Sequence, residues 1–449
     1  MSNTPSANVT GVRVEQLFGL YDYALGDYAE NRAFGPSLVV LYGDNGSGKT
    51  TLLRLINHTL SKELKGGHRT ALAKFPLKRF QVRVADGSEV GLVREGDSIQ
   101  GGYTFFVRRP GGIEHSTVAL VDQTGGVNPA PDPDAQVRWS ATMDALKSLN
   151  LALYYLPDDR RPETTKPEPT TIEFDEELYQ YVLASTERGV TTARVRQKSN
   201  VLEEAIRDLQ NIIRDEVLKA AGVGEANIYT IYAEIAKRAL ASGGKPLAVT
   251  TAESRELVQS LTSLMERSRQ FSRLGLVPRL DLQELITLST QAKATTRRFL
   301  ASVLKPYQES VSARLQALSP TRNLLDTFLG SLNSFYARKQ VTFDVGEGLR
   351  IVQDDGSRLP PSALSSGEQQ LLLLFCNTVR ARVQATVFLI DEPELSLNVK
   401  WQRRLIDALL RLVAGSPVQF FLATHSIELL ARHKEAVVHL EPPVRLSPR

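Results

Sequence analysis

The chain has 449 residues, 42% of them hydrophobic and 23% charged, a composition that is typical of a water-soluble globular protein. Its net charge of +4 arises from 54 basic and 50 acidic residues, and so small an excess does not by itself predict nucleic acid as a partner. The one cysteine, Cys376, excludes an intramolecular disulfide framework and a cysteine-rich metal site. No apolar run approaches the roughly 18 residues of a membrane span, and the N-terminus lacks a signal-peptide pattern. We therefore expect a cytoplasmic protein of two or three domains without membrane contact.

The stretch 43–50 reads Gly-Asp-Asn-Gly-Ser-Gly-Lys-Thr and lies between an apolar β-type run and a leucine-rich helical pattern. Strand, glycine-rich turn, Lys-Thr and helix are the context of a phosphate-binding P-loop. The glycines let backbone N–H groups turn inward around an anion, and the helix start adds the positive end of its dipole. We expect Lys49 to reach the β- and γ-phosphates and the Thr50 hydroxyl to bind Mg²⁺. The residues expected around the triphosphate are Gly43, Asn45, Gly46, Ser47, Gly48, Lys49, Thr50 and Thr51.

Short strands are predicted on both sides of the P-loop. Before it, the run 12–17 reads as a strand, and three aromatic residues follow in a hairpin-like turn: Phe18, Tyr21 and Tyr23. Their rings can stack on a nucleotide base, and ordinary core packing explains them equally well. After it, alternating strands and glycine turns predict a β-rich lobe, followed by a loop rich in Gly, Pro and Asp. The strands of the lobe are expected at 80–84, 89–93 and 103–108 and the loop at 125–133, and a separate buried strand is expected at 150–156.

Helical periodicity dominates from 175 to 339 and predicts a long helical insertion. The segments with apolar residues at helical spacing are 200–221, 228–240, 252–271, 281–290, 293–318 and 323–336. Residues 188–340 contain 23 Lys and Arg against 14 Asp and Glu, an excess of nine positive charges, while the rest of the chain carries a net −5. A basic helical arm can contact a polyanion such as DNA, and an ordinary solvated helix surface explains the charge equally well.

An α/β alternation follows the insertion. After strand character at 340–345 and 349–352, the elements are a helix at 371–383, a strand at 386–390, a helix at 399–413 and a strand at 418–422. Helices and strands in this order complete a parallel sheet. Because the P-loop precedes the insertion, we expect one α/β nucleotide-binding head with a β-rich lobe, split by the helical segment. The expected parts are an N-terminal half at 1–174, the insertion at 175–339 and a C-terminal half at 340–449.

Two carboxylates, Asp391 and Glu392, end the apolar strand at 386–390. Burying a carboxylate at the end of an apolar strand costs free energy unless it has a partner. The carboxyl edge of a parallel sheet, where these residues are expected, faces the ligand crevice. We expect Asp391 to hold Mg²⁺, directly or through water, and Glu392 to polarise the attacking water as general base. The alternative is an acidic strand end at the surface.

Two further motifs complete the candidate site. Ser365-Ser366-Gly367-Glu368 begins a helix 26 residues before Asp391, and Ser365, Gly367 and Glu368 are expected to form an anion-binding turn. The same pattern is also a common helix cap. His425 follows the strand at 418–422 and can hydrogen-bond a γ-phosphate or the attacking water, although a lone histidine is more often structural.

Together these motifs resemble the ABC-type ATPases, in the branch of RecF, SMC and OLD-like proteins, over about 10–60 and 340–440. The corresponding segments are 43–50 for Walker A, 364–370 for the signature, 387–392 for Walker B, 394–397 for the D-loop and His425 for the switch histidine. The resemblance implies Mg²⁺-dependent ATP hydrolysis with Lys49, Glu392 and His425 as catalytic residues. It also implies a homodimer of heads, or a higher homo-oligomer, in which Ser365 and Gly367 of one copy close on the triphosphate of the other. Asn398 stands where many relatives carry a histidine.

Two features favour the non-transporter branch: Ser-Ser-Gly-Glu in place of Ser-Gly-Gly-Gln, and an insertion of more than 150 residues. No metal-nuclease cluster stands out among the six histidines, so we expect effector chemistry on a separate protein, a nuclease or a toxin. Stand-alone ATPases of this size resemble subunits of bacterial anti-phage systems, which is the first hypothesis for the biological role. A DNA-repair ATPase that binds DNA with its basic arm is the second, and a transporter's nucleotide-binding subunit is the third.

Overall fold

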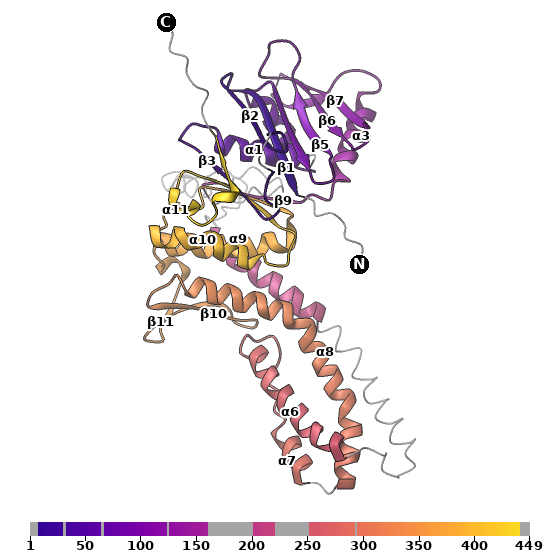
Figure 1. Cartoon of the computed structure of the whole chain (residues 1–449), viewed down its shortest axis with the longest axis vertical. Coiled ribbons are helices and arrows are strands. Elements are labelled where there is room, and N and C mark those ends of the chain that lie inside the picture. The colour runs from indigo at the N-terminus through magenta and orange to yellow at the C-terminus, as the bar shows by residue number, and fades with distance from the viewer. Residues whose placement is uncertain are drawn as a thin grey trace, which may run out of the picture. The chain divides into compact units, whose positions relative to one another are not determined.

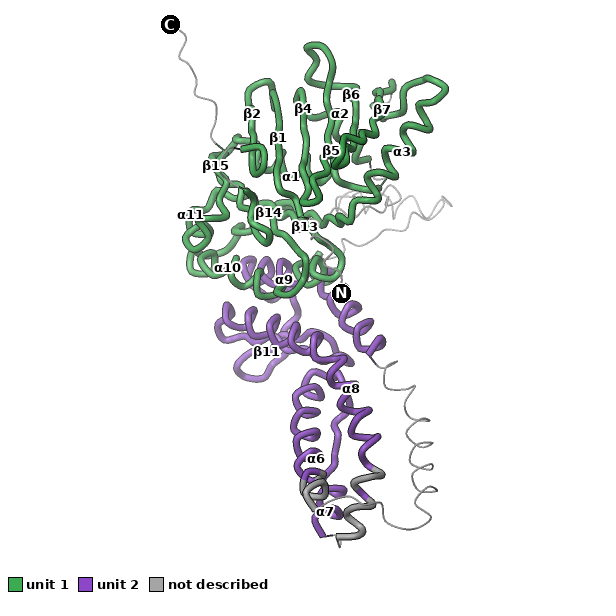
Figure 2. The backbone as a smooth tube through the Cα atoms, turned by 45° about the vertical axis from the view of Figure 1, so that its right-hand side comes forward, with its two compact units in different colours: residues 1–204, 377–449 green, residues 205–376 purple. Residues whose placement is uncertain are grey.

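The computed structural model describes residues 8–29, 33–63, 67–123, 125–159, 201–220, 251–291 and 294–440. The chain divides into two compact units, one formed by residues 1–204 with 377–449 and the other by 205–376 (Figure 2). The domain boundaries expected from the sequence at 174 and 339 stay predictions. The helix expected at 228–240 lies outside the described residues.

Unit 1 contains a parallel sheet that joins the two ends of the chain. In the described residues its strand order is β15-β3-β14-β13-β9, and every neighbouring pair is parallel. The strands are β3 (Leu38–Tyr42), β9 (Leu153–Leu156), β13 (Val387–Asp391), β14 (Gln419–Thr424) and β15 (Val437–His439). Every residue of β13 and β14 is buried, as their continuous apolar runs require when both faces of a sheet are covered. The α/β class and the interrupted head are thereby confirmed.

The second sheet of unit 1 is antiparallel and forms the β-rich lobe (Figure 1). Across the described residues its order is β2-β1-β4-β5-β6-β7-β8. The strands are β1 (Val9–Leu17), β2 (Tyr21–Gly26), β4 (Arg79–Val84), β5 (Glu89–Val93), β6 (Tyr103–Arg108), β7 (Glu114–Val121) and β8 (Val127–Pro129). The sequence predicted the lobe but missed its last two strands. β7 is largely exposed, and β8 is a three-residue edge strand inside the segment expected to be a loop.

Helix α1 (Lys49–Leu60) packs against both sheets of unit 1. It contacts β9, β13 and β14 of the parallel sheet and β5 of the antiparallel sheet. Its inward face is a stripe of buried aliphatic residues at helical spacing, Leu52, Leu53, Leu55 and Ile56. Burying each such side chain stabilises the fold by about 2 kcal/mol. The P-loop, which immediately precedes α1, is therefore anchored to the core of the unit.

Among the described residues, further helices of unit 1 lie on both sides of the insertion in sequence: α2 (His68–Lys74), α3 (Ala135–Lys147), α9 (Ser366–Gln384), α10 (Val399–Leu412) and α11 (Ile427–Leu430). Residues 201–204 also begin a helix that continues into unit 2. Helix α9 begins in unit 2, and the division between the units falls at residue 376 within it. Asn398 is the N-cap of α10, where its side chain accepts a hydrogen bond from the Trp401 N–H. The residue that departs from the family pattern therefore has a structural use here.

Unit 2 is built from helices and a small antiparallel sheet. Residues 205–220 are helical, and the further helices are α6 (Thr251–Ser272), α7 (Gln283–Gln291) and α8 (Ala294–Asn333). The sheet consists of β10 (Lys339–Asp344), β11 (Gly348–Gln353) and β12 (Arg358–Leu359). Among the helices described in either unit, none combines the length and the hydropathy of a membrane span.

Helix α8 corrects one expectation. The sequence predicted two separate helices, 293–318 and 323–336, but the structure has a single helix of 40 residues with Pro306 and Pro320 inside it. A proline removes one backbone hydrogen bond and bends a helix, yet it does not end the helix when packing on both sides continues. Buried residues at helical spacing lie on both sides of Pro320: Leu315 and Leu318 before it, and Leu325, Phe328 and Leu332 after it.

Candidate functional site

The P-loop leaves β3 and turns into α1 with the conformation that its glycines permit. Gly46 and Gly48 have φ values of 85° and 88°, in the left-handed region where other residues are strained. A Cβ atom on Gly43 would lie 2.9 Å from the Leu440 backbone oxygen and 2.8 Å from Ser47 Oγ, so a side chain there would have to displace backbone. These three positions therefore require glycine for conformational or steric reasons.

Lys49 closes the P-loop from the start of α1. Its Nζ donates to the backbone oxygens of Gly43 at 2.7 Å and of Asp44 at 3.0 Å, so the ammonium group lies against the loop. Asn45 is exposed on the turn, and Thr51 is half-buried in the first turn of α1. The charge of Lys49 thus lies where the loop would receive a phosphate.

Ser47 and Tyr23 connect the P-loop to the β-rich lobe. The Tyr23 hydroxyl donates to the backbone oxygen of Ser47 at 2.9 Å, and Tyr23 is only 7% exposed. For Tyr23 the packing alternative therefore holds, whereas base stacking by Phe18 or Tyr21 stays a prediction. Within the described residues the buried Ser47 hydroxyl oxygen has no hydrogen-bond partner. Such an orphaned hydroxyl beside inward-turned glycines suits an anion with several acceptor oxygens.

The P-loop meets the end of β13 through the two expected magnesium ligands. The Thr50 hydroxyl donates to Asp391 Oδ1 at 3.2 Å, although the two residues are 341 positions apart in the sequence. Two neighbouring oxygens of an octahedral Mg²⁺ shell, each about 2.1 Å from the ion, lie roughly 3.0 Å from one another. The hydroxyl and the fully buried carboxylate therefore have the chemistry and the separation to hold Mg²⁺ together.

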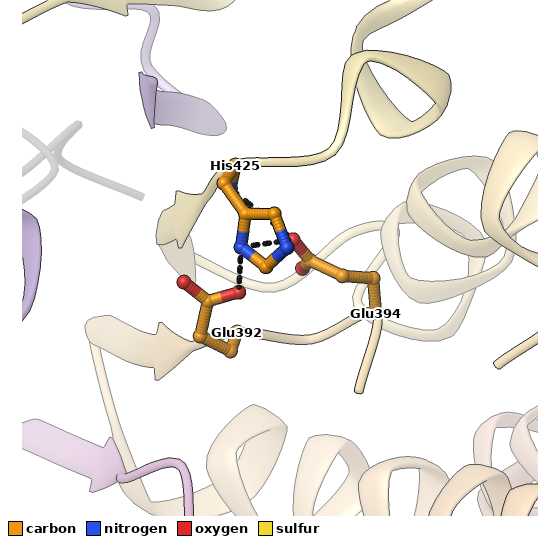
Figure 3. Close-up of side chains that lie close together, drawn as sticks. All are labelled: Glu392, Glu394 and His425. Carbon is orange, nitrogen blue, oxygen red and sulfur yellow. Dashed lines mark hydrogen bonds and ion pairs between the residues drawn. The ribbon is translucent and has the colours of Figure 1, made fainter. Parts of the chain in front are cut away.

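Glu392 and His425 meet at the ends of β13 and β14, as Figure 3 shows. His425 Nδ1 lies 2.7 Å from Glu392 Oε2 and 3.6 Å from Glu394 Oε1. Glu392 has a left-handed backbone with φ 48°, and its N–H donates to the Ala423 oxygen of the neighbouring strand at 2.9 Å. A left-handed non-glycine residue costs free energy, and such residues concentrate at functional sites. Here the turn brings the carboxylate to His425.

The surroundings of Glu392 favour its protonated form. Burial, followed by the negative charge of Glu394, raises the pKa of Glu392 to about 7, and the nearby His425 opposes this shift. A carboxyl whose pKa lies near neutrality can both accept and release a proton at the pH of the cell. This is the property that a general base requires.

The signature turn lies in unit 2 and forms a capping box at the start of α9. Ser365 Oγ donates to Glu368 Oε2 at 2.8 Å, the Ser365 N–H donates to the same oxygen at 2.8 Å, and the Glu368 N–H lies 3.4 Å from Ser365 Oγ. Gly367 is buried in the first turn of the helix. The helix-cap interpretation of this sequence is therefore confirmed. The cap leaves Ser365 itself exposed, and its use by a second copy stays a prediction.

Two residues that follow α8 hold the signature glutamate. Lys339 Nζ donates to Glu368 Oε2 at 2.7 Å, and the Tyr336 hydroxyl donates to the Glu368 backbone oxygen at 2.7 Å. Burial raises the pKa of Glu368, but the hydrogen bonds from Lys339 and Ser365 outweigh it and hold the pKa below its usual range. The signature glutamate is thus kept ionised.

Sequence reasoning missed the part that Glu394 plays. It was placed only within the D-loop segment, but it is 5% exposed and its carboxylate binds the turn that carries His425. The repeated acid in Asp-Glu-Pro-Glu was the available signal, because a buried carboxylate requires a partner. The contacts of Lys339 and Tyr336 with Glu368 were missed as well. No local signal could have revealed them, because they span 29 and 32 positions of sequence.

Comparisons with known proteins agree with these motifs. Residues 289–431 match a family model described as "AAA domain, putative AbiEii toxin, Type IV TA system". Over 84 residues the chain is 37% identical to the lipoprotein-releasing system ATP-binding protein LolD of Ruegeria sp. (strain TM1040), and over 78 residues it is 41% identical to LolD of Ruegeria pomeroyi. These matches cover 19% and 17% of this chain and 35% and 32% of the two relatives, so the chain spans about a third of their length.

Solved structures of SMC heads are also similar to this chain. The head domain with an extended coiled coil from Pyrococcus furiosus, bound to the C-terminal domain of ScpA, has a TM-score of 0.38 and 13% identity, covering 96% of this chain and 92% of that one. A head domain with a coiled coil and joint from Pyrococcus yayanosii has a TM-score of 0.36 and 12% identity, covering 96% and 94%. The motif order, the meeting of Walker A with Walker B and the family match over residues 289–431 make this part of the chain similar to ATP-binding ATPases of the ABC and AAA type.

Proposed function

We propose that the protein hydrolyses ATP to ADP and phosphate with Mg²⁺ at the site formed by the P-loop and the ends of β13 and β14. The observation that carries this proposal is the meeting of Thr50 with Asp391 across 341 positions of sequence, beside the pair formed by Glu392 and His425. A phosphate-binding turn, a magnesium-ligand pair and a carboxyl with a pKa near 7 are the parts that phosphoryl transfer to water requires.

Each side chain has a separate task in this reaction. Glu392 accepts the proton of the attacking water, and His425 at 2.7 Å orients the carboxylate. Lys49 exchanges its two carbonyl contacts for the β- and γ-phosphates and stabilises their charge. Thr50 and Asp391 hold Mg²⁺, which supplies charge neutralisation on the phosphate oxygens.

We expect the site to be completed by a second copy of the chain. The exposed Ser365, at the N-terminus of α9 with Gly367 in the following turn, is suited to bind a phosphate through its hydroxyl and through backbone N–H groups. In a two-fold dimer each copy would give its signature turn to the other and receive one in return. ATP binding would then drive the heads together, and hydrolysis would release them.

The dimerisation cycle would act on a separate effector protein. Anti-phage defence is the biological role that we favour, with a cytoplasmic nuclease or toxin as the partner. The description of the matched family supports a defence role, because it names a putative toxin of a Type IV TA system. The decisive genetic test is protection: Lys49→Ala should abolish resistance to infection in cells that carry the protein together with its neighbouring genes. Unchanged protection would exclude a nucleotide-driven defence role.

A DNA-binding repair ATPase is the second candidate, favoured by the positive excess of nine charges in residues 188–340. Duplex DNA should then stimulate ATP hydrolysis, and the stimulation should fall steeply with salt because binding releases counterions. Heparin and single-stranded DNA serve as controls for nonspecific polyanion binding. The LolD matches keep a transporter subunit as a third candidate, and that role requires a membrane partner encoded nearby.

The enzymatic proposal is tested by Glu392→Gln, which keeps the shape of the side chain and removes its basicity. Phosphate release should fall by about 1,000-fold, whereas ATP affinity should stay within a few-fold of wild type. Size-exclusion chromatography with ATP and Mg²⁺ should show a trapped dimer. Hydrolysis near the wild-type rate would contradict the general-base role, and the absence of hydrolysis in the wild type would contradict the enzymatic function itself.

A further inference from the structure

Glu394 is a buried carboxylate to which the proposed reaction assigns no task. It is 5% exposed and lies two residues after the general base, at the start of the segment 394–397. Burying an ionised carboxylate costs free energy unless hydrogen bonds compensate for the lost water. Its partners therefore indicate what the burial achieves.

The partners of Glu394 Oε1 are three consecutive residues at the end of β14. The oxygen accepts from the Thr424 hydroxyl, from the His425 N–H at 3.2 Å and from the Ser426 N–H at 3.2 Å. The Ser426 N–H also lies 2.9 Å from the Thr424 hydroxyl oxygen, which closes the turn on itself. One carboxylate oxygen thus binds the backbone on both sides of the His425 Cα atom.

A second bridge joins the same two segments. Gln402 Nε2 donates to the Leu397 backbone oxygen at 2.8 Å, and the Ser426 hydroxyl donates to Gln402 Oε1 at 2.7 Å. The segment 394–397 and the His425 turn are therefore joined at both ends, by Glu394 and by Gln402. Figure 3 shows Glu394 and Glu392 on either side of the His425 ring.

We propose that Glu394 is a positioning residue: by capping the turn 424–426 it fixes the His425 imidazole against Glu392, and so transmits the position of segment 394–397 to the catalytic pair. This inference rests on the ATPase activity proposed above. It assigns Glu394 no contact with nucleotide or water. Because the effect passes through His425, replacing Glu394 should matter only while His425 is present.

Four variants separate this task from general stability. Glu394→Ala removes the cap, Glu394→Asp withdraws the carboxylate by one methylene, and Glu394→Gln keeps an acceptor oxygen but removes the charge. Glu428→Ala is the matched control, because this neighbouring glutamate of α11 pairs with Arg403 at 2.6 Å and does not cap the turn.

Steady-state kinetics give the first readout. Glu394→Ala should lower kcat by up to about 100-fold with KM for ATP within about threefold, since misplacing a catalytic group by an ångström has this cost. Glu394→Gln should retain kcat within about threefold, and Glu428→Ala should match the wild type. In a His425→Ala background, Glu394→Ala should produce no further loss. Equal losses in Glu394→Ala and Glu394→Gln, or additive losses with His425→Ala, would overturn the proposal.

Hydrogen exchange gives the second readout and does not depend on turnover. The His425 and Ser426 amides should exchange faster in Glu394→Ala than in Glu394→Gln or Glu428→Ala, because only the alanine removes their acceptor. If the alanine variant does not fold, Glu394→Asp replaces it in both measurements and should lose at least about fivefold in kcat. The two proposals can fail separately. If Glu392→Gln abolishes turnover but Glu394→Ala and Glu394→Asp turn over ATP at the wild-type rate, this inference is overturned and the ATPase proposal stands.

Discussion

Two glutamates in two turns of the molecule have pKa values that their neighbours shift in opposite directions. Glu392 follows β13 in unit 1 beside Glu394, and its pKa is raised to about 7. Glu368 lies in the first turn of α9 in unit 2 beside Lys339, and its pKa is lowered. Burial disfavours the charge in both places, so the difference comes from the neighbour: an acid in one turn and a lysine in the other. The first glutamate can exchange a proton near neutral pH, while the second acts as a fixed charge.

The largest expected difference is in ATP turnover, when each of the two glutamates is replaced by glutamine. Glu392→Gln removes the proposed base and should lower ATP turnover by about 1,000-fold. Glu368→Gln should lower it by about tenfold or less, because it changes only the cap hydrogen bonds and the ion pair with Lys339. Phosphate release by the two purified variants measures the difference. Equal losses would mean that the two carboxylates do not differ in function.

Removing the positive charge of Lys339 should show what the ion pair between Lys339 and Glu368 contributes. Lys339→Met leaves Glu368 charged beside Ser365 without its partner, and a charge-assisted hydrogen bond of this kind contributes about 1.5–3 kcal/mol. We expect turnover to fall by about tenfold. The double variant Lys339→Met with Glu368→Gln should recover most of the loss, since no uncompensated charge remains, and a failure to recover would contradict the electrostatic explanation.

The pH dependence of hydrolysis should follow Glu392. Because its pKa is raised to about 7, the basic form is lost as the pH falls through 7, and kcat/KM should drop by about tenfold per pH unit below that value. The effect on stability has the opposite direction, since a raised carboxyl pKa favours the folded state at acid pH and this contribution is lost as the pH rises through 7. A flat kcat/KM profile between about pH 5 and 8 would contradict the assignment.

The smallest expected effect concerns the contact between the β-rich lobe and the P-loop. Tyr23→Phe removes the hydroxyl that binds the Ser47 backbone oxygen, which should cost about 1 kcal/mol of unfolding free energy. Urea denaturation measures this cost, with Tyr21→Phe as the control on the neighbouring ring, 5.8 Å away. Equal destabilisation by both substitutions would remove the special role of the Tyr23 hydroxyl.

The sequence predicted those parts of the site whose signal is local. The P-loop is a fixed spacing of glycines, lysine and threonine, and β13 and β14 are continuous apolar runs ending in polar residues. Contacts with distant partners were not predictable in this way. Glu394 binds a residue 30 positions away, and the choice between a base-stacking and a buried Tyr23 depended on where the hydroxyl points.

The elements that the sequence missed escaped prediction for equally physical reasons. A proline usually marks a helix end, but Pro320 lies where buried residues continue on both sides, so tertiary packing overrides the local signal. β7 has few buried residues, so it lacks the clear alternation that identifies a strand. Helix α3 is the exception, because it does carry Ala135, Trp139, Met143 and Leu146 at helical spacing, and this local signal was missed.

In the proposed dimer two copies of the chain share each ATP site, and mixing two inactive variants tests this central claim most directly. Lys49→Ala disables the P-loop and Ser365→Arg blocks the signature turn, so neither variant alone should hydrolyse ATP. In an equal mixture about half of the dimers are mixed, and each mixed dimer contains one site with both wild-type residues. Turnover should then recover to as much as about one quarter of the wild-type value. Turnover that stays at the level of the separate variants would contradict the shared site.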